Sequence, residues 1–75
     1  MKLLNQLAID EEAIVCQVLC KNRRLRDLGL VEGTKIKRVL RSPLGDPSAY
    51  RFRGSVIAIR KEEASQIKVQ VKHDE

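Results

Sequence analysis

The sequence predicts a mainly β fold, a small barrel of about five short strands with one or two short helices. Short runs of alternating apolar and polar residues recur along the chain, and closely spaced turn residues separate them. Closure into a barrel would remove most of the unpaired strand edges of so short a sheet. Because the chain has 75 residues, we expect one domain over residues 1–75.

The first half of the chain is expected to combine one buried strand with one short helix. Residues 3–7 have leucines at helical spacing but equally suit a first strand or an irregular cap on the core. Residues 13–20 are rich in isoleucine, valine and leucine, which is typical of a largely buried strand. A helix of about two turns should follow over residues 23–28, because Asn22 suits its N-cap and Gly29 suits the left-handed residue after its end.

The next strand, over residues 34–41, departs from simple alternation. A strict period of two would put Ile36 and Val39 on opposite faces of the sheet. A bulge near Lys37 and Arg38 would return both apolar side chains to the core and bend the strand. Bent strands of this kind are what a small barrel needs at its corners.

The two aromatic residues alternate with arginine in the strand that follows. Tyr50 and Phe52 are expected to point into the core, with Arg51 and Arg53 on a solvated face. The remaining expected elements are a strand over residues 56–60, one helical turn over residues 61–65 and a strand over residues 67–71.

The chain lacks the residue clusters that catalysis or a structural metal site requires. Its soft metal ligands are Cys16, Cys20 and the single histidine, His73, whereas a structural zinc site takes four ligands. On a strand the two cysteines would stand roughly 13 Å apart, beyond the roughly 7 Å that a disulfide allows, so we expect two small buried apolar side chains. No serine or cysteine has a base near it in the sequence. We therefore expect a binding module, not an enzyme, with no cofactor, metal site or small-molecule substrate.

The charge of the chain permits a nucleic-acid partner but does not favour one. The net charge is +5, yet aromatic residues make up 3% of the chain, whereas proteins that bind single strands use several exposed aromatic side chains. No apolar run reaches the roughly 20 residues of a membrane helix, and the N-terminus lacks the pattern of a signal peptide. We therefore expect a cytoplasmic protein without membrane insertion.

Two motifs stand out by their order and spacing. The first is Leu25-Arg26-Asp27-Leu28-Gly29-Leu30 with Glu32-Gly33-Thr34, and the second is Ser42-Pro43-Leu44-Gly45-Asp46-Pro47. They are followed by Arg53-Gly54, Ile57-Ala58-Ile59-Arg60-Lys61, Glu63-Ala64 and Ile67-Lys68-Val69. Together, over residues 8–71, they resemble the family of ferrous iron transport protein A, the FeoA-type domain.

This resemblance implies a fold, a partner and a contact surface. The fold would be an SH3-like small β-barrel with short helices. The partner would be a membrane ferrous iron transporter with a GTPase domain, which the cytosolic protein contacts peripherally. The contact residues that we expect are Leu25, Arg26 and Leu28, unless the core takes the two leucines, together with Pro43, Leu44, Gly45 and Asp46.

Alternatives remain open at this point. The loop over residues 42–47 contains two prolines, which lower the entropy lost when a loop docks on a partner, but a rigid turn between two strands explains them equally well. The whole chain could instead be a basic nucleic-acid-binding barrel, or a metal-sensing or metallochaperone domain that uses the two cysteines.

Overall fold

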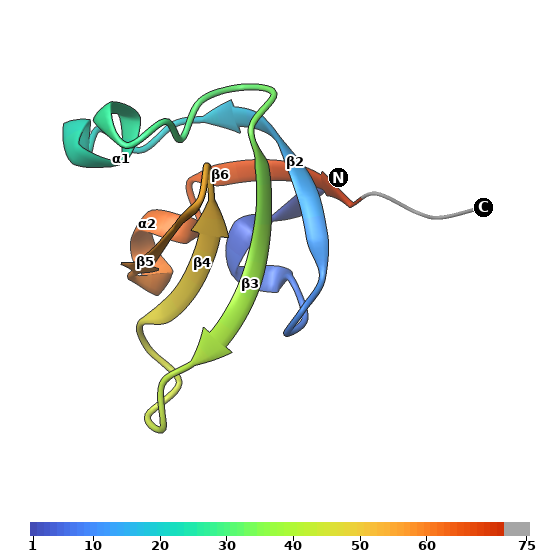
Figure 1. The fold of residues 1–75 in the computed structure, drawn as a ribbon, viewed down its shortest axis with the longest axis vertical. Helices are drawn as coiled ribbons and strands as arrows, with labels where there is room; N and C mark the ends of the chain where they lie inside the picture. The colour runs from blue at the N-terminus through green and yellow to red at the C-terminus, as the bar shows by residue number, and fades with distance from the viewer. Residues whose placement is uncertain (72–75) are drawn as a thin grey trace.

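The computed structural model describes residues 1–71, and their strands form one antiparallel sheet. The strands are β1 (Lys2–Leu3), β2 (Glu12–Val18), β3 (Lys35–Arg41), β4 (Ser48–Phe52), β5 (Ser55–Ile59) and β6 (Ile67–Val71), in the spatial order β1-β6-β2-β3-β4-β5. The helices are a 3-10 helix η1 (Leu4–Gln6), α1 (Arg23–Asp27) and α2 (Lys61–Ala64). Figure 1 shows the sheet curling around an interior that η1 and α2 help to cover. The mainly β, barrel-like fold with short helices is confirmed.

The alternating strands supply the core as expected. The side chains of Tyr50 and Phe52 are each 1% exposed, whereas Arg51 and Arg53 are exposed. Ile67 and Val69 on β6 are fully buried for the same reason, because successive side chains of a strand point to opposite faces. The prediction of the aromatic residues as core residues is therefore confirmed.

The prediction for the strand over residues 34–41 was wrong about which side chain enters the core. The pairing of β3 with β4 shifts between Arg38 and Leu40, so an irregularity is present, but it lies one residue later than expected. Ile36 and Arg38 are therefore the two residues of β3 that point inward, and Val39 is only partly buried. The physical reason is that Arg38 finds acceptors for its N–H groups inside the barrel, which allows an arginine to occupy a core position.

The start of α1 has the predicted cap. The side chain of Asn22 accepts a hydrogen bond from the backbone N–H of Arg24 at 3.0 Å, and its amide nitrogen donates to Glu63 Oε2 at 2.6 Å. The helix itself has 5 residues and is shorter than expected. Asn22 thus joins the first turn of α1 to α2, two elements far apart in the sequence.

The end of α1 meets the hairpin between β4 and β5. Gly29 has φ +102°, the left-handed backbone that glycine tolerates best, and a side-chain carbon at this position would overlap with Arg53. Arg53 and Gly54 form the two-residue hairpin turn, both with positive φ. Gly29 is therefore favoured by its backbone geometry, and the flexible side chain of Arg53 covers the space that a side chain at this position would enter.

Candidate partner-binding surface

The loop between β3 and β4 is held by hydrogen bonds at both ends. Within it, the backbone N–H of Gly45 donates to the carbonyl of Ser42 at 2.8 Å. Asp46 Oδ1 accepts from the backbone N–H of Lys61 at 2.8 Å, which ties the loop to the first residue of α2. Leu44, at the tip, is 94% exposed. The loop therefore presents an apolar side chain to solvent on a fixed backbone.

A second exposed leucine lies beside this loop. Leu40, near the end of β3, is 63% exposed. It lies directly after the irregular pairing of β3 with β4. We call the set of Leu40, Pro43, Leu44, Gly45 and Asp46 the loop surface.

The residues predicted around α1 separate into core and surface. Leu25 is 3% exposed and belongs to the core, which is the exception allowed for it, so its side chain is not available to a partner. Arg26 is exposed, and Leu28 is 36% exposed. Leu19 and Val31, which the sequence analysis did not single out, are 52% and 42% exposed and line hollows that Arg26 also lines. We call Leu19, Arg26, Leu28 and Val31 the α1 surface.

The structure does not bring the two predicted groups of contact residues together. Figure 1 shows α1 at one end of the molecule and the loop between β3 and β4 at the other. The molecule extends 32 Å along its longest axis. A single small contact patch therefore cannot include both the loop surface and the α1 surface.

Behind the loop surface lies a hollow with a buried arginine in its wall. The hollow has a volume of about 210 Å³ and is lined by Asn5, Arg38, Arg41, Gly45, Asp46, Ser48, Tyr50, Ile59 and Lys61. The guanidinium of Arg38 lies 6.0 Å from the centre of the Tyr50 ring. Burial raises the pKa of Tyr50 above its usual 10.0, and the positive charge of Arg38 and a hydrogen bond from Ser48 oppose this rise.

Within residues 1–71, no three histidine, cysteine, aspartate or glutamate side chains lie together as metal ligands would. Cys16 is partly buried, and Cys20 is 7% exposed. Both are free thiols. The expectation that both cysteines are buried is confirmed for Cys20 and wrong for Cys16, which is only partly buried. Cys16 is less buried because it lies where the pairing of β2 with β6 becomes irregular. His73 lies outside the described residues.

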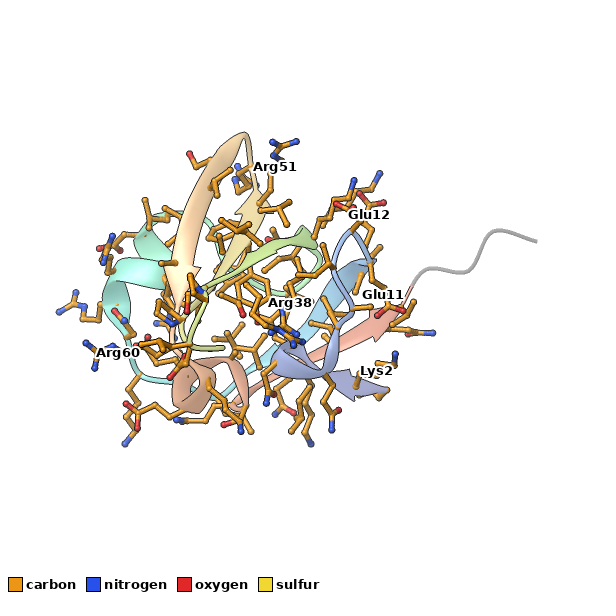
Figure 2. All side chains as sticks on the ribbon, turned by 90° about the horizontal axis from the view of Figure 1, so that it is seen from below. Lys2, Glu11, Glu12, Arg38, Arg51 and Arg60 are labelled. Atoms are coloured by element: carbon orange, nitrogen blue, oxygen red, sulfur yellow. The ribbon has the colours of Figure 1, made fainter. Side chains whose placement is uncertain are left out.

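The arginine side chains other than that of Arg38 are exposed to solvent. Figure 2 shows Arg51 and Arg60 at the periphery of the molecule and Arg38 inside it. Since Tyr50 and Phe52 are buried, neither is available to stack on a nucleotide base. In the described part of the chain, no helix is both long and apolar enough to span a membrane.

Comparisons with known proteins agree with each other. A family model described as the FeoA domain matches residues 2–71. The chain is similar to the solved FeoA protein of Chlorobium tepidum, with 37% identity and a TM-score of 0.91, over 99% of this chain and 74% of that one. FeoA of Stenotrophomonas maltophilia, described as a procaryotic SH3 domain protein and solved in complex with zinc, is 31% identical with a TM-score of 0.78, over 93% of this chain and 91% of that one. The SH3-like fold expected from the motifs is therefore confirmed.

A longer protein also contains a similar sequence. It is the Fe(2+) transport protein A/Fe(2+) transporter FeoB fusion protein of Porphyromonas gingivalis, which is 30% identical over 71 residues. The match covers 91% of this chain but 8% of the fusion protein. This chain thus corresponds to a small part of that relative.

Proposed function

This chain belongs to the FeoA domain family, and from this premise we propose that it is an accessory protein of ferrous iron uptake. It binds the cytosolic, GTPase-containing part of a membrane ferrous iron transporter and catalyses no reaction itself. The binding takes place in the cytoplasm, as a peripheral contact without membrane insertion. The family is the one that the two sequence motifs indicated.

The observation that carries the proposal is the fused relative of Porphyromonas gingivalis, in which a similar domain shares one chain with an Fe(2+) transporter. Joining two proteins covalently raises the effective concentration of each at the other. Such a fusion is favourable where the two parts work in contact. We infer that this chain makes the same association as a separate protein.

The loop surface is the face that we propose for the contact. Leu44 and Leu40 offer apolar area that is unburied in the free protein, and burying such area stabilises a complex. The bond from Lys61 to Asp46 fixes the loop before binding, so less conformational entropy is lost when a partner docks. These two features together suit a small protein interface with an apolar centre.

The α1 surface is the alternative face, and the two faces can be separated experimentally. We propose a pull-down with the cytosolic part of the transporter, using the wild-type protein, Leu44→Asp and Leu28→Asp. The expected result is that the wild-type protein and Leu28→Asp are retained and Leu44→Asp is not, because a carboxylate at the tip would be buried without a partner.

Two results would contradict parts of this proposal. Retention of a folded Leu44→Asp protein at the wild-type level would exclude the loop surface. Failure of the wild-type protein to be retained at all, with a folded transporter fragment, would exclude the association itself.

A further inference from the structure

The guanidinium of Arg38 is buried without an acidic partner among the described residues. Arg38 is 6% exposed, and its charge is met by three uncharged acceptors. Its Nη1 donates to the carbonyl oxygens of Asn5 and Leu7 at 3.2 and 2.6 Å, and its Nη2 donates to Ser48 Oγ at 2.7 Å. The ion pair found within residues 1–71 joins Lys2 to Glu11 and does not include Arg38. The hydrogen bonds that the guanidinium makes among the described residues therefore all go to uncharged acceptors.

The hydrogen-bonding capacity of Arg38 is also incomplete. A guanidinium carries five N–H donors, and three of those of Arg38 are engaged by the contacts above. Its Nε is buried and has no hydrogen-bond partner. Buried polar groups in proteins usually have partners, so the Nε–H of Arg38 is a donor that a bound acceptor could satisfy.

The hollow next to Arg38 adds further positive charge. Its lining residues include Arg41 and Lys61, which are exposed, and one acidic residue, Asp46. Three cations and one anion leave an excess of two positive charges around a hollow of about 210 Å³. Because Arg38 is buried and the other two cations are exposed, its charge acts from the depth of the hollow and theirs act at the mouth.

We propose that this hollow binds a carboxylate, supplied by an aspartate or glutamate side chain of the protein partner, which rests on the function proposed above. Asp46 and the unpartnered Asn5 Oδ1 also line the hollow and repel an anion, so the attraction comes from the excess of two positive charges. Gly45 and Asp46 belong both to the loop surface and to the lining of the hollow. A partner that covers Leu44 therefore lies next to the hollow and can place a side-chain carboxylate in it.

The first arm of the test uses small molecules and needs no transporter. The probe is N-acetyl-glutamate α-amide, with N-acetyl-glutamine α-amide, inorganic phosphate and sodium chloride at matched ionic strength for comparison. The readout is the NMR signal of the Arg38 Nε–H group, which a buried position protects from solvent exchange. The expected result is a saturable shift with the glutamate compound and none with its neutral analogue.

Matched variants identify the side chains responsible. Arg41→Gln/Lys61→Gln removes the two cations at the mouth, and Arg51→Gln/Lys68→Gln removes two exposed cations that do not line the hollow. The first variant should bind the glutamate compound about tenfold more weakly, and the second should bind it like the wild-type protein. Equal weakening by both variants, shifts that grow linearly as with chloride, or tighter saturable binding of phosphate would each overturn the proposal.

The second arm uses the cytosolic part of the transporter and separates the two proposals. If the wild-type protein binds it, Arg41→Gln/Lys61→Gln should bind about tenfold more weakly than Arg51→Gln/Lys68→Gln. Equal binding by the two variants would overturn the carboxylate pocket and leave the proposed function intact. If the wild-type protein does not bind, the proposed function fails, and the small-molecule arm alone decides whether the hollow is a carboxylate site.

Discussion

Replacing Arg38 with methionine tests whether the buried guanidinium stabilises the barrel. Arg38 lies on β3 and donates hydrogen bonds to the segment after β1 and to Ser48 on β4. β1 is at one edge of the sheet, and β3 and β4 lie toward the other edge, so these bonds cross the interior of the barrel. Methionine has a similar length and is apolar, so Arg38→Met removes the bonds without opening a large cavity.

The expected loss of stability follows from two opposing quantities. Three hydrogen bonds from a charged donor contribute roughly 1.5–3 kcal/mol each. Burying the guanidinium costs several kcal/mol, which offsets more than half of that gain. The net loss in Arg38→Met should be about 2–4 kcal/mol, in a protein whose free energy of unfolding at 75 residues is of the order of 4–11 kcal/mol.

Urea denaturation measured by circular dichroism checks this prediction, with Arg51→Met as the control. Arg51 is exposed, so its replacement should change the free energy of unfolding by less than about 0.5 kcal/mol. An Arg38→Met protein as stable as the wild type would show that the desolvation of the guanidinium cancels its hydrogen bonds, so that the buried arginine does not stabilise the barrel.

Three further predictions concern other contacts of the fold. Gly29→Ala should lower the free energy of unfolding by about 1–2 kcal/mol in thermal denaturation, because the added methyl group strains a backbone of positive φ, while the flexible side chain of Arg53 can move aside. A loss below about 0.5 kcal/mol would contradict the left-handed backbone at this position. Asn22→Ala should lower the free energy of unfolding by about 1–2 kcal/mol, since it removes both the cap of α1 and the hydrogen bond to Glu63. Glu63→Ala should lower it by less, because this variant loses the hydrogen bond but keeps the cap. Burial raises the pKa of Tyr50, so the folded protein keeps the phenol protonated at a pH where the unfolded chain has lost this proton. The free energy of unfolding should therefore not depend on this group below pH 10.0 and should fall as the pH rises above 10.0. Tyrosinate absorbance at pH 10.0 equal to that of the unfolded chain would refute this prediction.

The strands with a clear period of two could be predicted from the sequence because local alternation determines which face is buried. Tyr50 and Phe52 entered the core as expected, and Asn22 capped its helix, since an N-cap depends on residues close in sequence. These elements depend on local chemistry that a single sequence contains.

The position of Arg38 could not be predicted in the same way. Arginine is rarely buried, and its acceptors on Asn5 and Leu7 lie more than 30 residues away in sequence. The hollow behind the loop depends on the same long-range arrangement. The separation of α1 from the loop also required the three-dimensional structure, because motif spacing along a chain does not determine the distance across a curled sheet.

The most direct test of the proposed association is a calorimetric titration of the cytosolic part of the transporter with Leu44→Asp, Val56→Asp and the wild-type protein. Leu44 and Val56 are 94% and 52% exposed, so neither change should disturb the fold. Burial of a leucine side chain contributes roughly 1.5–3 kcal/mol, so Leu44→Asp should raise Kd by at least about tenfold while Val56→Asp leaves it unchanged. Equal Kd values for the three proteins would contradict the claim that the loop surface binds the transporter.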